Sequence, residues 1–260
     1  MMSECIWLAS GDDFRTRIID ATTTSVKSLG ATWSARIQLR SQIAGYTAIT
    51  LATTFPRELP VVYDDCFYSF DVGVLKSNLQ KAIRRRNVTN SVATIRQLMS
   101  QSLADALRRY PIIMCEDSVI QHSRFPYLVW LMCAITKGWN IREADKTFIV
   151  KSVSDLAVSP VRYVFHEADP AISPEALQEQ WTLRVADDQN VNSNHMQIAF
   201  SLWVRVEYGG MSGDMAMLRL ICSRFINREV PSEVFSEVQP LDVLSGDLPG
   251  GKYSPMHSLQ

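Results

Sequence analysis

The sequence predicts an α+β protein, mainly α-helical, in which a helical bundle follows a small β-containing N-terminal part. Before residue 54, one segment alternates apolar and polar residues, as in a half-buried strand, and a second is rich in threonine and isoleucine. From residue 71 onward, apolar residues recur at helical spacing, and serine, proline and glycine stand where helices begin and end. We therefore expect a β-containing part at 1–70, a helical bundle at 71–240 and a loose tail at 241–260.

The N-terminal part is expected to form a small antiparallel sheet of three strands. Residues 33–40 alternate apolar and polar side chains, and residues 46–53 are rich in threonine and isoleucine. Gly45 marks the turn between these strands, and residues 59–63 are the third candidate. Residues 12–24 are expected to pack on this sheet as a helix.

The first helices are predicted by their apolar stripes and their capping residues. One stripe contains Leu75, Leu79, Ala82 and Ile83. The next helix begins near Thr89 or Asn90 and is expected to bury Val92, Ile95, Leu98 and Met99. Ser102, with Asp105 three residues later, resembles a capping box and starts a third helix. Pro111 is expected to end this helix or to restart it as an N1 proline.

Four further helices follow from the same signals. Pro126 opens one that Gly138 closes, and residues 143–157 form the next. Ser173 caps a helix that runs to about residue 186. Residues 194–208 form a helix ended by two glycines, in a turn that either packs tightly or cradles an anion with its backbone amides. Ser212 is expected to cap the last helix, which carries Met215, Leu218, Ile221, Cys222 and Phe225.

Composition limits the classes of function. The formal net charge of −1 means that any nucleic-acid binding must come from a local patch. The five cysteines are widely spaced and form no Cys-x-x-Cys, so we expect reduced core thiols in an intracellular compartment, cytoplasmic or nuclear. We expect no membrane span, because no run of about 18 apolar residues occurs.

The usual chemical motifs are absent from the sequence. It contains no P-loop, no Gly-x-Gly-x-x-Gly after a strand and no Gly-x-Ser-x-Gly. The histidines form no His-Glu-x-x-His or His-x-His pair. We therefore expect no cofactor and no metal, and we assign no catalytic residue, although an active site assembled from distant residues would escape such a search.

The most distinctive feature is a basic helical stretch. Between Lys76 and Arg109 the sequence has eight basic residues and one acid, Asp105. Arginine suits phosphate because its guanidinium group can donate to two oxygens at once. The stretch can therefore bind nucleic acid, contact an acidic protein or form an ordinary solvated helix face. The candidate binding residues are Lys81, Arg84, Arg85, Arg86, Arg108 and Arg109.

Glu116 and Asp117 follow the apolar run after Pro111 and offer a structural alternative. Adjacent residues on a helix point about 100° apart, so the two carboxylates are poorly placed to hold one metal ion together. We expect them to serve as a cap or to form ion pairs with Arg108 or Arg109 inside the bundle. If they neutralise the arginines there, the basic stretch is a scaffold.

Two segments together resemble a known family. Residues 79–88, with Lys81-Ala82-Ile83-Arg84, and residues 107–117, with Arg108-Arg109 and Glu116-Asp117, are similar to the C-terminal helical collar of clamp-loader-related AAA+ recombination factors. The resemblance covers about forty residues and implies a helical assembly module near DNA. The ATPase motifs of that family are missing, so ATP hydrolysis is not implied.

The leading hypothesis is a non-enzymatic module that binds nucleic acid, or a nucleic-acid-processing complex, through the basic stretch. The second is a structural subunit of a large assembly, such as a virion or a ribonucleoprotein particle. Protein partners and an oligomer are plausible under both hypotheses. The six tryptophans and ten methionines would supply the contact area of such a subunit. An enzyme with a dispersed active site is the third.

Overall fold

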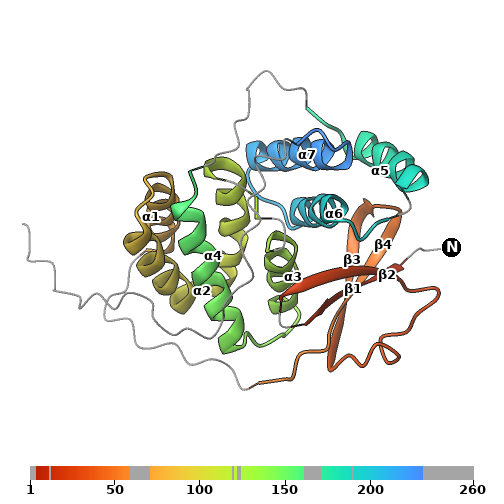
Figure 1. Cartoon of the computed structure of the whole chain (residues 1–260), viewed down its shortest axis with the longest axis horizontal. Helices are drawn as coiled ribbons and strands as arrows, with labels where there is room; N and C mark the ends of the chain where they lie inside the picture. Colours follow the sequence, from red (N-terminus) through yellow and green to blue (C-terminus); the bar gives the residue numbers. More distant parts are fainter. Residues whose placement is uncertain are drawn as a thin grey trace, which may run out of the picture.

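The computed structural model describes residues 4–11, 13–58, 71–118, 120–121, 124–160, 171–188 and 190–230. In these residues a four-stranded sheet forms one end of the molecule, and of the seven helices some pack on one face of the sheet while the others extend beyond it (Figure 1). The class is therefore α+β, mainly α, as the sequence predicts. The expected third strand at 59–63 and the expected tail at 241–260 lie outside the described residues.

The sheet has the strand order β2-β1-β4-β3. Its strands are β1 (Glu4–Ser10), β2 (Arg15–Asp20), β3 (Trp33–Ile43) and β4 (Tyr46–Thr53). The pairs β1–β2 and β3–β4 are antiparallel, whereas β1 and β4 run parallel in the centre. The predicted strands at 33–40 and 46–53 are confirmed, but the sheet is mixed and has four strands, so the expected three-stranded antiparallel sheet is wrong.

The helix expected at residues 12–24 is also wrong, because β2 occupies Arg15–Asp20. Thr16 and Ile18 are buried while Arg15 and Arg17 are exposed, which is the period of a strand. The turn before β2 contains Phe14, whose positive φ of 55° is supported by ring contacts with Tyr127 and Phe148. These aromatic contacts favour a backbone conformation that a bulky residue seldom adopts.

The helices are α1 (Val72–Arg84), α2 (Val88–Asp117), α3 (Phe125–Ile135), α4 (Glu143–Val158), α5 (Pro174–Asp188), α6 (Asn194–Glu207) and α7 (Ser212–Ile226). Every predicted helix from residue 71 onward is present. Asp71 and Asn87 cap α1 and α2 through hydrogen bonds to backbone N–H groups three residues later. Ser212 is the first residue of α7, and Met211 takes the N-cap position that we had expected for the serine.

Helix α2 consists of two segments that meet at Ser102, whose φ of −156° and ψ of 87° are not helical. Ser102 caps the second segment, because its hydroxyl accepts from the Asp105 N–H. The side-chain contacts Lys76–Asp105 and Arg84–Asp117 show that the second segment, residues 103–117, runs alongside α1 in the same direction. The first segment, residues 88–101, is joined to α1 by a short turn, so the chain doubles back twice.

Pro111 neither ends nor restarts this second segment. It lies inside the helix and is buried. A proline lacks the N–H of a helix interior and crowds the preceding turn, so nearby carbonyl groups need other donors. The Arg205 side chain on α6 donates twice to the Arg108 carbonyl, three residues before Pro111. Pro111 removes the helical donor of the Leu107 carbonyl, four residues before it, and Arg205 binds the next carbonyl of the same turn.

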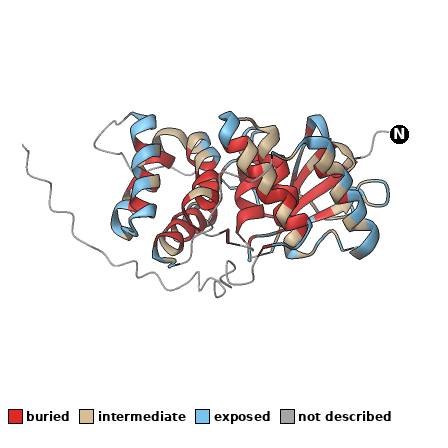
Figure 2. Ribbon diagram, turned by 90° about the horizontal axis from the view of Figure 1, so that it is seen from above, coloured by how far each residue is buried: buried red, intermediate tan, exposed pale blue. Residues whose placement is uncertain are grey.

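One hydrophobic cluster runs from the inner face of the sheet through the whole bundle, from Cys5 to Val230. Helices α3 and α6 lie against the sheet, while α1, α2 and α4 form the far end of the molecule (Figure 1). Burial is greatest between the layers and lowest on the outer helix faces (Figure 2). Each of the six tryptophans is at most 7% exposed, so their side chains are used inside the chain.

Candidate nucleic-acid interface

The six predicted binding residues fall into two different environments. Arg84, Arg108 and Arg109 are tied to other helices by ion pairs or hydrogen bonds. Arg84, Arg108 and Arg109 therefore contact other helices, although the side chains of Arg84 and Arg108 also remain exposed. Lys81, Arg85 and Arg86 face solvent at the C-terminal end of α1.

Arg84 is paired with Asp117. The distance from Arg84 Nε to Asp117 Oδ1 is 2.6 Å, and the Asp117 side chain is 6% exposed. Gln80 lies beside this pair and donates from Nε2 to both Asp117 and Glu116, at 2.7 and 2.9 Å. The neighbouring carboxylates raise the pKa of Arg84, so its charge is held in place and compensated.

Arg109 is the second arginine in this group. It donates to the Gln80 side-chain oxygen at 2.6 Å and lies 3.3 Å from Glu116 Oε2. On its other side it lies 3.6 Å from Asp214 of α7. We call the six residues Gln80, Arg84, Arg109, Glu116, Asp117 and Asp214 the polar seam. It joins α1, the second segment of α2 and α7.

The polar seam contains two cations and three carboxylates. Burial raises the pKa of Glu116, and the nearby Asp214 and Asp117 add to this effect against the opposing Arg109. The expected ion pair between Arg109 and Glu116 is therefore present, and Asp117 pairs with Arg84 instead. Both arginines are therefore charge-compensated, and Arg109 is mostly buried whereas the Arg84 side chain stays 52% exposed.

Arg108 forms a reciprocal contact with the end of α6. Its guanidinium group donates to the Tyr208 carbonyl at 3.0 Å, while Arg205 donates to the Arg108 carbonyl and to the Gly209 carbonyl. Burial lowers the pKa of Arg205 to about 10, and Arg108 adds to this effect. Arg108 lies near the level of Lys76 on α1, about 13 Å along the helix from Arg85. Arg108 therefore lies well away from the C-terminal end of α1, where Arg85 stands.

Lys81, Arg85 and Arg86, which we call the basic end, gather where α1 meets α2. Lys81 and Arg85 are one turn apart on the same side of the helix, and Arg85 is the C-cap of α1. Cations at this position are favoured by the negative end of the helix dipole. Among the residues that the structure describes, no ion pair joins these three side chains to an acid; Arg86 donates to the Pro160 carbonyl at 3.0 Å. The basic end therefore offers three cations to solvent.

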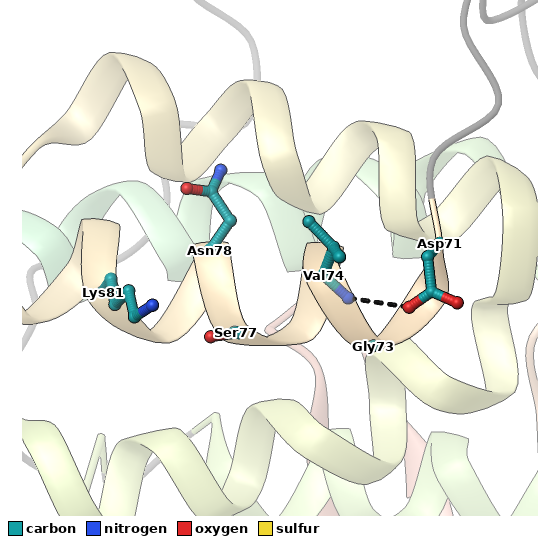
Figure 3. A pocket seen from close by; sticks show the side chains of 6 residues that line it. All are labelled: Asp71, Gly73, Val74, Ser77, Asn78 and Lys81. Atoms are coloured by element: carbon teal, nitrogen blue, oxygen red, sulfur yellow. Dashed lines mark hydrogen bonds between the residues drawn. The ribbon is translucent and has the colours of Figure 1, made fainter.

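A shallow hollow of about 430 Å³ lies next to the basic end (Figure 3). Its described lining comes from α1 and its cap: Asp71, Gly73, Val74, Ser77, Asn78 and Lys81. The polar groups are partly engaged, because Asp71 caps the Val74 N–H and Asn78 donates to Thr94. Lys81 alone belongs to both the hollow and the basic end.

Other chemistry finds little support in the described part of the chain. No group of three or more His, Cys, Asp and Glu side chains there is arranged to hold a metal ion. The four described cysteines are buried and not in disulfides, and burial raises the pKa of each thiol. His195 and Phe225 lie in ring contact, and burial lowers the pKa of His195. No described helix has the length and apolar character needed to cross a membrane.

Comparison of the chain with known proteins gives no match to a family model, to a curated protein or to a solved structure.

Sequence reasoning missed three residues that organise this region: Gln80, Arg205 and Asp214. Each acts on a helix that is distant in sequence, since Gln80 reaches Glu116 and Arg205 reaches Arg108. For Arg205 the hint was indirect: a proline inside a helix frees the carbonyl four residues before it, here that of Leu107, and Arg205 donates to the carbonyl next to it. Gln80 and Asp214 had no such signal.

Proposed function

We propose that this chain is a non-enzymatic module that binds nucleic acid through the basic end, Lys81, Arg85 and Arg86. The observation that carries this proposal is the separation of the six cations. Arg84 and Arg109 are neutralised in the polar seam, whereas the basic end is exposed and lacks an acidic partner in the described residues. A cluster of exposed cations is a natural phosphate-binding surface.

Binding through the basic end would be electrostatic and independent of base sequence. The neighbouring surface of α1 presents Val74, Ser77 and Asn78, which provides no aromatic ring on which a base can stack. Contacts to the phosphate backbone fix position but do not read bases. We therefore propose backbone binding with similar affinity for different sequences.

The resemblance to the recombination-factor collar is compatible with this proposal. Its two segments correspond to the end of α1 with the following turn and to the second segment of α2, which the polar seam holds side by side. On this view the arginine pair Arg108-Arg109 supports the arrangement of helices, and the basic end contacts the nucleic acid. An assembly near DNA would combine both roles.

The test compares two variants that lose the same charge. The first carries Lys81→Gln, Arg85→Gln and Arg86→Gln. The control removes three exposed cations elsewhere, Arg17→Gln, Lys27→Gln and Lys137→Gln. Fluorescence anisotropy with a labelled duplex and a labelled single strand measures the dissociation constant of each variant.

We expect the basic-end variant to lose at least about tenfold in affinity at low salt, because three phosphate contacts disappear. The control should stay within about threefold of the unmodified protein, since it changes only the overall charge. Equal losses in both variants would mean that net charge alone drives binding. Absence of binding by the unmodified protein would exclude the proposal. If the chain bound an acidic protein instead, the same variant would lose that partner without any effect on nucleic acid.

A further inference from the structure

Among the described residues, the Asn192 side chain closes the middle of the open edge of β2. Asn192 lies in the turn between α5 and α6, and its side-chain oxygen accepts from the Ile18 backbone N–H at 2.8 Å. Its side-chain nitrogen donates to the Ile18 carbonyl at 3.0 Å. In an antiparallel sheet, two paired residues exchange the same two hydrogen bonds. The amide of Asn192 therefore reproduces the bonds of a neighbouring strand.

The Asn192 side chain is held in this position by a small network. Gln197 on α6 donates to the Asn192 side-chain oxygen at 2.6 Å. Thr16, two residues before Ile18 on β2, donates to the Gln197 oxygen at 2.9 Å. The Asn192 backbone N–H also donates to the Asn190 side chain. Two hydrogen bonds thus join the Asn192 amide to Ile18, and three further hydrogen bonds support its position.

An edge strand with free N–H and C=O groups is a template for another strand, and proteins usually block it. We propose that the Asn192 turn is a plug on the β2 edge, and that removing it exposes a self-association surface which takes β2 of a second copy of this chain. The partner would extend the sheet across a twofold axis. This proposal does not depend on nucleic-acid binding.

The sequence of β2 permits antiparallel pairing with a second copy. The N–H and C=O of Ile18 point away from β1, toward the open edge. In an antiparallel pair with a second copy, Ile18 must therefore face a residue whose N–H and C=O also point to the edge. Even-numbered residues of β2 then lie opposite even-numbered residues of the second copy. An antiparallel pairing centred on Ile18 puts Ile18 opposite its copy, Thr16 opposite Asp20 and Arg17 opposite Ile19. No arginine then faces an arginine. A symmetric pairing of this kind buries the same patch on both copies.

The experiment uses the full chain with Asn192→Ala, and the matched control is Asn140→Ala, an exposed asparagine after α3. Sedimentation velocity from about 1 to about 100 µM measures the dimer fraction. We expect the unmodified chain and the control to remain monomeric and Asn192→Ala to dimerise. Hydrogen exchange at the Ile18 amide should be slow in the unmodified chain. It should be fast in Asn192→Ala at concentrations low enough to keep that variant monomeric, because the Ile18 N–H then lacks an acceptor.

The register is tested by two further variants in the Asn192→Ala background. Ile19→Glu places a carboxylate opposite Arg17 of the other copy, and Ile19→Arg places a second arginine there. An opposite-charge pair across two strands changes the dimerisation constant by up to about fivefold, and the twofold dimer contains two such pairs. Ile19→Glu in the Asn192→Ala background should therefore dimerise up to about 25-fold more tightly than Asn192→Ala alone. Ile19→Arg should weaken the dimer by a similar factor. Both variants lose the same apolar side chain.

Three results would overturn the proposal. One is a folded Asn192→Ala protein that stays monomeric over the whole concentration range. Another is equal dimerisation of the Ile19→Glu and Ile19→Arg variants, which would place the contact elsewhere. The third is an unmodified chain that dimerises as strongly as Asn192→Ala. If Asn192→Ala does not fold, Asn192→Asp takes its place, because aspartate keeps the oxygen that accepts from Ile18 and loses the N–H that donates to it. We expect Asn192→Asp to dimerise more than the unmodified chain and less than a full loss of the amide would allow, and a purely monomeric Asn192→Asp protein would refute the proposed plug.

Discussion

The buried pair Arg142–Asp145 gives a sharp test of how the two parts of the fold are joined. Asp145 on α4 is fully buried, and Arg142 is 6% exposed. The carboxylate accepts from Arg142 and from the Tyr127 hydroxyl on α3. The guanidinium carbon lies 3.7 Å from the ring centre of Phe55, which follows β4. This cluster therefore connects the sheet side of the molecule to α3 and α4.

The substitution Asp145→Asn keeps the shape of the side chain and removes its charge. Arg142 then remains buried without a counter-ion, which costs about 3–5 kcal/mol in known cases. For a protein of this size, about 1 kcal/mol lowers the Tm by about 2–4 °C, so the expected loss is about 6–20 °C. Thermal unfolding followed by circular dichroism measures this difference.

A triple variant tests the reasoning behind that magnitude. Tyr127→Phe, Arg142→Met and Asp145→Leu together remove every polar member of the cluster and keep its volume. We expect this variant to recover all but about 1 kcal/mol, the cost of losing the Asp145 cap at the start of α4. A triple variant as unstable as Asp145→Asn, or an Asp145→Asn variant that loses less than about 1 kcal/mol, would refute the account of a buried, mutually compensated pair.

Three smaller predictions concern other parts of the chain. Glu116→Gln should stabilise the protein near pH 7 by less than about 1 kcal/mol, because the raised pKa of Glu116 means that folding favours its neutral form. In urea titrations the gain should be absent at about pH 3 and should grow as the pH rises through the pKa of Glu116 in the folded protein. A loss of stability at neutral pH would contradict this prediction. Ser102→Ala should cost about 1 kcal/mol by urea titration, because the second segment of α2 loses its cap, whereas Ser100→Ala serves as a control in the same helix and should cost less. At most one of the five cysteines should react quickly with a thiol reagent in the native state, and rapid reaction of two or more would contradict the burial of Cys5, Cys115, Cys133 and Cys222.

The helical part could be predicted from sequence because its signals are local. Leu75, Leu79, Ala82 and Ile83 repeat at helical spacing, and all four are buried in α1. Ser102 caps a helix as its sequence context suggests, since its hydroxyl reaches the Asp105 N–H only three residues away. In each case the residues that decide the structure lie within one or two turns of each other.

The sheet could be predicted only in part. Strand β1 lies between β2 and β4, and residues 5–9 are buried on both faces. A strand in this position is a continuous apolar run without alternation, so periodicity cannot distinguish it from a buried helix. In the edge strand β2, buried and exposed side chains alternate. The adjacent residues Ile18 and Ile19 interrupt the alternation of apolar and polar residues in the sequence, so only a few residues show it.

The candidate site shows the same division between local and distant determinants. The cluster Arg84-Arg85-Arg86 and the acids Glu116 and Asp117 are visible in the sequence, and so is the chance that they pair. Which arginine finds which acid depends on the reversal of α2 at Ser102, which brings Asp117 beside Arg84. The sequence therefore predicts six candidate cations, and in the fold Lys81, Arg85 and Arg86 stand together at the end of α1 without an ion pair among the described residues.

The most direct test of the proposed function is the salt dependence of nucleic-acid binding. For duplex DNA the slope of log K against log salt is about −0.9 for each phosphate neutralised. Three contacts at the basic end predict a slope of about −2.7, and thus about a 40-fold loss of affinity between about 50 and 200 mM salt. The Lys81→Gln, Arg85→Gln, Arg86→Gln variant should lose most of this slope. A slope near zero would contradict binding through the basic end. A slope near −5.4 corresponds to about six phosphate contacts, and if the variant left it unchanged, other cations would make those contacts.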